Sequence, residues 1–306
     1  MSVRYWKAFA AVVLLLLVAW FIDLGEAVAQ LRQTEWRWLL PAFAIVQLQI
    51  VLSAVRWKIT AARLGQQLTF GRAVSEYYLA TFANLSLPGG VSGDAARVYR
   101  NRQAPVVSIA VHGVLLERLS GQVALLVTGV MGWILWPVLM HGEVPALGST
   151  VLLSTAALLG IVVLLVAAIF RWAPARITKA VKQLGPAMRA AWWSDKQWIV
   201  QGTLSLLVTA TYMLVFLFSS YAVQAPLPVA ALLTLVPLVL LSMMIPLSIG
   251  GWGIREAAAA VLWPFAALTA ESGIATSIVY ALVSMLGCLP GLILMFGLRL
   301  RHLRSP

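Results

Sequence analysis

Two proline-led, glycine-rich segments each place an arginine nine residues after a proline, in otherwise apolar surroundings. The first runs from Pro88 to Arg97 and the second from Pro246 to Arg255, and both fit Pro-x-x-[Val/Ile]-x-Gly-x-x-x-Arg. A glycine loop that opens a helix exposes backbone N–H groups, and the helix dipole favours an anion there. The arginine adds a forked donor suited to phosphate. The two segments therefore predict a site for a phosphate group.

The candidate substrate-binding residues are the small, polar and charged members of these segments, with one amide that precedes the first. They are Asn84, Pro88, Gly89, Gly90, Ser92, Gly93, Asp94 and Arg97, and then Ser248, Gly250, Gly251, Arg255 and Glu256. The neutral donors among them could instead satisfy local backbone groups. Asp94 is also placed to cap the helix that begins there, because an aspartate at a helix N-terminus accepts backbone N–H bonds.

A further acid–base pair, Glu117 and Arg118, lies inside an apolar run that begins near Val106 and completes the candidate set. An ionisable side chain in a membrane span costs about 2.5–3.5 kcal/mol on insertion scales and by default marks function. Adjacent residues point in different directions on a helix, so each should have a different partner. Arg97 and Arg255 are the leading candidates for Glu117. Alternatively, all these charges form buried structural ion pairs, which would not exclude a binding role.

The elements that position these residues are expected to lie in a membrane. Of the 306 residues, 61% are hydrophobic and 10% are charged, whereas a soluble domain carries about 25% charge. The net charge of +12 does not indicate nucleic acid, because the basic residues sit in loops that alternate along the chain. We predict a single all-α, polytopic transmembrane domain over residues 1–306, with no nucleic-acid partner.

Six apolar stretches have the length of about 20 residues that a bilayer span needs. They are Trp6–Ile22, Trp38–Val55, Val106–Trp136, Thr150–Phe170, Trp198–Val223 and Gly273–Leu298. We interpret the segments Tyr77–Asp94 and Leu232–Trp263, which the glycine motifs break, as re-entrant helical hairpins. Broken backbone is tolerated at membrane depth only where protein buries it or a wet cavity borders it. Three spans separate the hairpins, so they should enter from opposite faces and meet near the bilayer centre.

The positive-inside rule orients the chain with both termini in the cytoplasm of an inner-membrane protein. Basic residues dominate the loops on that side, including the one after Val55, which would hold Arg56, Lys58, Arg63 and Arg72. The opposite loops are mainly acidic. Residues 171–197 form a basic cytoplasmic segment, either an amphipathic helix on the membrane surface or a solvated loop. The first 29 residues also have the pattern of a signal peptide, as an alternative to the first span.

Taken together, these motifs resemble the lysylphosphatidylglycerol synthase transmembrane family, also called the flippase-like domain family. The resemblance covers nearly the whole chain and rests on Arg56-Trp57, Asn84, 87–94, Arg97, Glu117-Arg118 and 246–256. It implies a domain that moves a lipid between leaflets, as this domain is thought to do in larger members that also carry a soluble synthase domain. The chain ends at Pro306 without that domain, so we expect a stand-alone member that is not an enzyme.

The resemblance implies a lipid and the arginine motifs favour a phosphate headgroup, but the identity of the lipid does not carry over from the family. Candidates are a phospholipid, aminoacylated phosphatidylglycerol, a hopanoid or a polyprenyl-phosphate-linked sugar. Two alternatives are a non-transporting partner of a glycosyltransferase and a membrane-embedded lipid-modifying enzyme. The enzyme is disfavoured because no metal-ligand spacing is visible and the three histidines lie far apart. We expect neither metal nor cofactor. A glycosyltransferase or lipid-modifying enzyme and a second copy of the chain are open as partners.

Overall fold

The computed structural model describes residues 24–87, 91–101, 107–140, 184–244, 250–291 and 293, and its regular elements there are all helices. They are α2 (Leu24–Arg32), α3 (Trp36–Arg63), α4 (Phe70–Ser86), α5 (Ser92–Asn101), α6 (Val107–Leu139), α9 (Gln197–Ala222), α10 (Val229–Ser242), α11 (Ile254–Leu262) and α12 (Ala270–Gly287). Short helical turns are η1 (Arg189–Trp193), η2 (Ser194–Lys196) and η3 (Trp263–Ala266). The predicted all-helical architecture is confirmed for these residues.

Four helices within the described ranges are long and apolar enough to cross a membrane. They are Trp36–Arg63, Ile109–Leu139, Leu184–Ala222 and Ala270–Gly291. Each contains most of one predicted span. The predicted spans Trp6–Ile22 and Thr150–Phe170 lie outside the described residues, as do the termini whose orientation was predicted. The protein is therefore a membrane protein, while the count of six spans and the placement of the termini stay predictions.

One face of α6 shows how the bundle meets its apolar surroundings. Large apolar side chains are exposed along this face at helical spacing, namely Val123, Val127, Val130, Ile134 and Val138. A monomeric soluble protein rarely exposes an apolar strip of this kind. The opposite face of α6 packs on α10, where Gly132 lies so close to Leu233 that a β-carbon would stand 2.6 Å from its backbone. A lipid-facing side and a protein-facing side are thus distinct on this helix.

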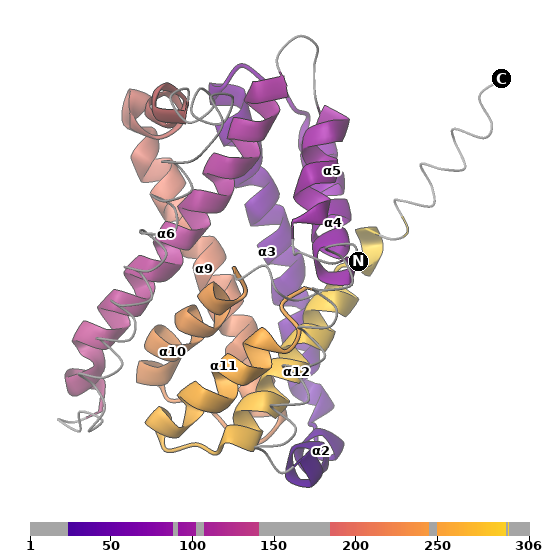
Figure 1. Cartoon of the computed structure of the whole chain (residues 1–306), viewed down its shortest axis with the longest axis vertical. Helices are drawn as coiled ribbons and strands as arrows, with labels where there is room; N and C mark the ends of the chain where they lie inside the picture. The colour runs from indigo at the N-terminus through magenta and orange to yellow at the C-terminus, as the bar shows by residue number, and fades with distance from the viewer. Residues whose placement is uncertain are drawn as a thin grey trace, which may run out of the picture.

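Each glycine-rich segment joins two helices that are shorter than a span. Helices α4 and α5 have 17 and 10 residues, and α10 and α11 have 14 and 9. At 1.5 Å per residue, α5 is about 15 Å long and α11 about 13 Å, about half of the hydrocarbon core. In Figure 1, α4 and α5 lie side by side in the upper part of the bundle, and α10 and α11 lie in the lower part. These are helix–loop–helix pairs, and their entry from opposite membrane faces stays a prediction.

The second glycine segment touches the helix that precedes the first. Gly250 lies against the end of α4, because a β-carbon there would be 2.4 Å from the carbonyl oxygen of Leu85. Pro88 and Pro246, which define the shared pattern, lie outside the described residues. The second segment therefore contacts the end of α4, while the meeting of the two segments near the bilayer centre stays a prediction.

Gly250→Ala tests this contact. Gly250 has φ of 58°, so alanine would cost about 1–2 kcal/mol in the left-handed region and would also push on Leu85. We expect a lower melting temperature in detergent. Gly65→Ala is the matched control, because Gly65 has a positive φ of 91° but no atom within 4 Å of its β-carbon position. Equal losses in both variants would mean that the contact with Leu85 contributes nothing.

The basic segment 171–197 is described only from residue 184 onward. There it forms helical turns that lead into α9, with left-handed backbone at Asp195 and Lys196. Asp195 pairs with Arg63 at the end of α3, at 2.6 Å on the exposed surface. This end of the segment is therefore attached to the bundle. Its association with a membrane surface stays a prediction.

Candidate functional site

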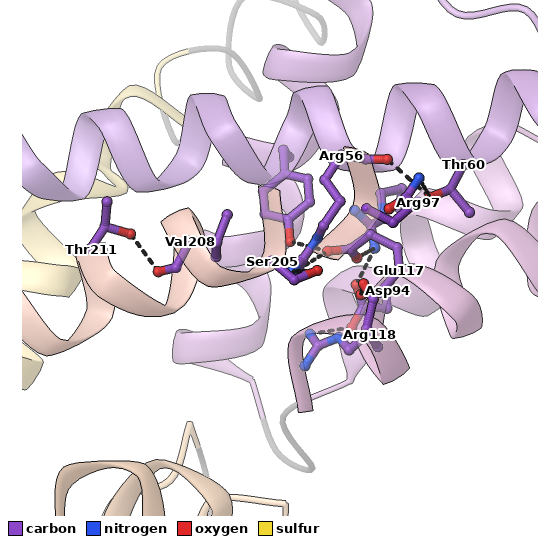
Figure 2. Close-up of polar contacts among 12 residues, drawn as sticks. Arg56, Thr60, Asp94, Arg97, Glu117, Arg118, Ser205, Val208 and Thr211 are labelled. Carbon is purple, nitrogen blue, oxygen red and sulfur yellow. Dashed lines mark hydrogen bonds and ion pairs between the residues drawn. The ribbon is translucent and has the colours of Figure 1, made fainter. Parts of the chain in front are cut away.

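Glu117 on α6 is the centre of a buried ion cluster. Its side chain is 1% exposed, and Arg56 on α3 reaches Oε1 at 2.5 Å through Nη2. Arg97 on α5 reaches Oε2 at 3.2 Å, and the hydroxyl of Tyr77 on α4 donates to Oε1 at 3.0 Å. Figure 2 shows the side chains of Arg56, Arg97 and Glu117 converging from separate helices. The predicted pairing of Glu117 with Arg97 is confirmed, whereas Arg255 pairs elsewhere.

Asp94 at the start of α5 links this centre to Arg118. Arg97 Nη2 donates to Oδ1 of Asp94 at 3.0 Å, and Arg118 forms an ion pair with Oδ2. Asn84 donates from its amide to the same Oδ2 at 3.3 Å. The Arg118 side chain is 40% exposed, whereas Arg97 is fully buried. Of the arginines in the cluster, Arg118 is therefore the one that an incoming molecule can reach.

Asn84 and Gly93 hold the end of α4 against the start of α5. The backbone N–H of Gly93 donates to Oδ1 of Asn84 at 2.7 Å, so Asn84 satisfies local backbone as well as Asp94. Gly93 also lies against α4, where a β-carbon would be 1.9 Å from the carbonyl oxygen of Ala80. Only glycine allows so close an approach of two backbones. These two contacts of Gly93 thus position Asp94 and Arg97 toward α6.

Arg97 is held on its faces as well as at its edge. Its guanidinium carbon lies 4.5 Å from the ring centroid of Trp57 and 4.8 Å from that of Tyr77, which are cation–π distances. Its buried Nε and Nη1 atoms have no hydrogen-bond partner among the described residues. Two aromatic rings and two carboxylates therefore hold this cation while some of its donors stay unused.

The predicted position of Arg56 in a cytoplasmic loop is wrong. Helix α3 continues to Arg63, so Arg56 lies within the helix and is almost completely buried. Its Nη1 donates to Ser205 on α9 at 3.2 Å. Gly121, one turn after Glu117, leaves room for the guanidinium, since a β-carbon there would be 3.2 Å from Nη2. The Arg56-Trp57 pair had been noted for the family resemblance but not as part of the site.

The second glycine segment holds an ion pair of its own. Arg255 Nη2 lies 2.6 Å from Oε1 of Glu256, and its Nε donates to Ser277 on α12 at 2.8 Å. The other carboxylate oxygen of Glu256 accepts the backbone N–H of Gly253 at 2.6 Å, which caps α11. Left-handed φ at Gly250, at Gly251 and at Gly253 shapes this turn. Arg255 and Glu256 are thus paired within their own segment and α12.

The structure therefore gathers most of the predicted residues into two groups. The first contains Asn84, Gly93, Asp94, Arg97, Glu117 and Arg118, and the second contains Gly250, Gly251, Arg255 and Glu256. Ser92 begins α5. Pro88, Gly89, Gly90 and Ser248 lie outside the described residues. Arg56, Tyr77 and Ser205 join the first group without having been predicted there.

The formal charges of the first group do not cancel. Three guanidinium groups, of Arg56, Arg97 and Arg118, face two carboxylates, of Asp94 and Glu117. An uncompensated buried charge is costly, so a cluster with excess positive charge favours an anion. The arrangement can therefore attract and hydrogen-bond an anionic group beside Arg118.

A bundle of membrane-spanning helices that encloses such ion pairs beside two glycine-rich turns defines a polytopic membrane protein with a polar centre. The family model described as the lysylphosphatidylglycerol synthase TM region matches residues 7–291. The chain therefore belongs to this family, as the motifs indicated. Membership links it to lipid modification or transport in a membrane. A search of curated proteins gave no match.

Proposed function

We propose that the protein moves or presents a phosphate-bearing lipid across the inner membrane without modifying it chemically, with the headgroup bound at Arg118. The observation that carries this proposal is the excess positive charge of the ion cluster, together with the 40% exposure of Arg118. A lipid headgroup that crosses an apolar core needs a compensating polar site on the way. Arg118 offers a guanidinium whose forked donors match phosphate oxygens.

The other charged residues of the cluster support Arg118 in this scheme. Asp94 holds its guanidinium by an ion pair, and Asp94 is itself fixed by Arg97 and Asn84. Glu117 fixes Arg97 and Arg56 through its two oxygens. A preorganised group costs less to order when a ligand binds than a free side chain does. The cluster therefore acts as a rigid base beneath one accessible cation.

A leaflet-translocation assay in proteoliposomes tests the proposal. The panel contains fluorescent phosphatidylglycerol, lysyl-phosphatidylglycerol and a polyprenyl-phosphate sugar. A neutral diacylglycerol, which has no phosphate, is the control lipid. We expect faster translocation of at least one phosphate lipid than in protein-free vesicles. Binding without translocation would favour the non-transporting partner of a glycosyltransferase. The absence of both binding and translocation would remove the proposal. A chemically altered lipid, detected by mass spectrometry, would favour an enzyme.

Arg118→Gln is expected to slow that translocation by about tenfold or more, because a lost charge-assisted contact with phosphate is worth at least 1.4 kcal/mol, which is about a factor of ten. The translocation rate of Arg118→Lys should lie between those of the wild type and Arg118→Gln, since lysine keeps the charge but not the forked geometry. Arg37→Gln is the matched control, because Arg37 is a surface arginine paired with Glu35. An Arg118→Gln variant that translocates like Arg37→Gln would rule out Arg118 as the headgroup contact.

A further inference from the structure

We infer that this site selects a headgroup with one negative charge, a phosphodiester, over a diphosphate. The inference rests on the proposed function and names the headgroup class of the same site. It starts from the ion pairs among Arg56, Arg97, Arg118, Asp94 and Glu117. Arginine stays protonated in proteins. Each carboxylate contacts two guanidinium groups. With three guanidinium groups and two carboxylates, the sum of the formal charges in the cluster is therefore +1.

Two neighbouring ion pairs leave this sum unchanged. Arg255 pairs with Glu256, and Arg100 pairs with Glu76 at 2.8 Å, so each of these pairs adds zero. The remaining residues of the two glycine segments, 88–90 and 245–249, carry no ionisable side chain. One added negative charge would make the cluster neutral, whereas two would leave it negative.

The donors of Arg97 show that the described residues supply the cluster with fewer acceptors than its arginines can use. Its Nε and Nη1 atoms are buried without a hydrogen-bond partner among the described residues, although buried donors are normally satisfied. Asp94 and Glu117 already share its Nη2. A phosphodiester brings two unbridged oxygens with a single charge, so at the exposed Arg118 it supplies acceptors without making the cluster negative. A diphosphate supplies more acceptors at the cost of a net negative site.

In a low-dielectric site, one formal charge changes binding by about tenfold or more. We therefore expect the wild type to bind a phosphodiester lipid at least about tenfold more tightly than a diphosphate lipid with identical alkyl chains. Asp94→Asn raises the sum to +2 while keeping a side chain of the same shape. It should shift the ratio of the two affinities by about tenfold toward the diphosphate lipid.

The measurement is the affinity of each synthetic lipid for the full chain in nanodiscs, by competition with a fluorescent lipid. Glu76→Gln is the matched control, because it also removes one carboxylate beside an arginine but lies outside the cluster. Asp94→Ser carries the same charge change and serves if Asp94→Asn does not fold. Arg118→Lys keeps the sum at +1, so both affinities should fall while their ratio stays.

The outcomes separate this inference from the function on which it rests. An unchanged ratio in folded Asp94→Asn and Asp94→Ser would overturn charge selection, even if Arg118→Gln abolishes binding of both lipids. Wild-type binding of both lipids by Arg118→Gln would instead remove the proposed function. A water-soluble glycerophosphodiester that competes as well as the lipid would identify the ligand as a free phosphodiester, and not a lipid. A ratio that shifts equally in Glu76→Gln would assign the effect to overall charge and would also overturn the inference.

Discussion

Replacing Glu117 with glutamine is expected to lower the free energy of unfolding by about 3–5 kcal/mol, the cost of removing one partner from a buried ion pair. The carboxylate contacts Arg56 and Arg97, and both arginines are almost completely buried. Glutamine keeps the shape and can accept one hydrogen bond, but it leaves Arg97 with the carboxylate of Asp94 alone and Arg56 with no carboxylate partner among the described residues. The loss should appear as a lower melting temperature and lower yield of purified protein in detergent.

Glu35→Gln is the control for this experiment. Glu35 also accepts bonds from an arginine and an amide, Arg37 and Gln224, but lies at the surface. Exposed ion pairs contribute little, because water and salt screen them. We expect this variant to melt close to the wild type. If Glu117→Gln melted there too, the cluster would not stabilise the bundle, and its charges would have to be explained by ligand binding alone.

Replacing Gly93 with valine is expected to lower the free energy of unfolding by about 3 kcal/mol or more, at the upper end of the range for overpacked sites. A β-carbon at Gly93 would stand 1.9 Å from the carbonyl oxygen of Ala80. The backbone fixes the position of the β-carbon and the oxygen is a backbone atom, so a side-chain rotation cannot relieve the contact. Helix α5 would have to move away from α4, and Asp94 and Arg97 would move with it. Translocation should therefore fall together with the melting temperature.

Gly202→Ala is the matched control, since Gly202 lies in α9 with nothing within 4 Å of its β-carbon position. Alanine is a better helix former than glycine by about 0.8–1.0 kcal/mol, so this variant should melt at or above the wild-type temperature. A Gly93→Val variant with wild-type melting and translocation would show that α4 and α5 are not held as tightly as the close approach indicates.

The sequence by itself determined the features that depend on short stretches of chain. Apolar runs of span length, broken by proline and glycine, predicted an all-helical membrane protein, and the four long apolar helices agree with it. The cost of a charge in such a run predicted that Glu117 would have a charged partner and named Arg97 correctly. Both inferences work because the membrane restricts what a local pattern can become.

The partners of the remaining charges were decided only by the tertiary structure. Arg56 lies 61 residues before Glu117, and their ion pair forms because α3 and α6 meet there. Arg255 was as good a candidate for Glu117 by sequence, yet Glu256 and Ser277 hold it within another part of the bundle. Exposure is also a property of the packed bundle, and it distinguishes the accessible Arg118 from the buried Arg97. Pairing and burial depend on which helices cross at a given depth, and local sequence does not specify that.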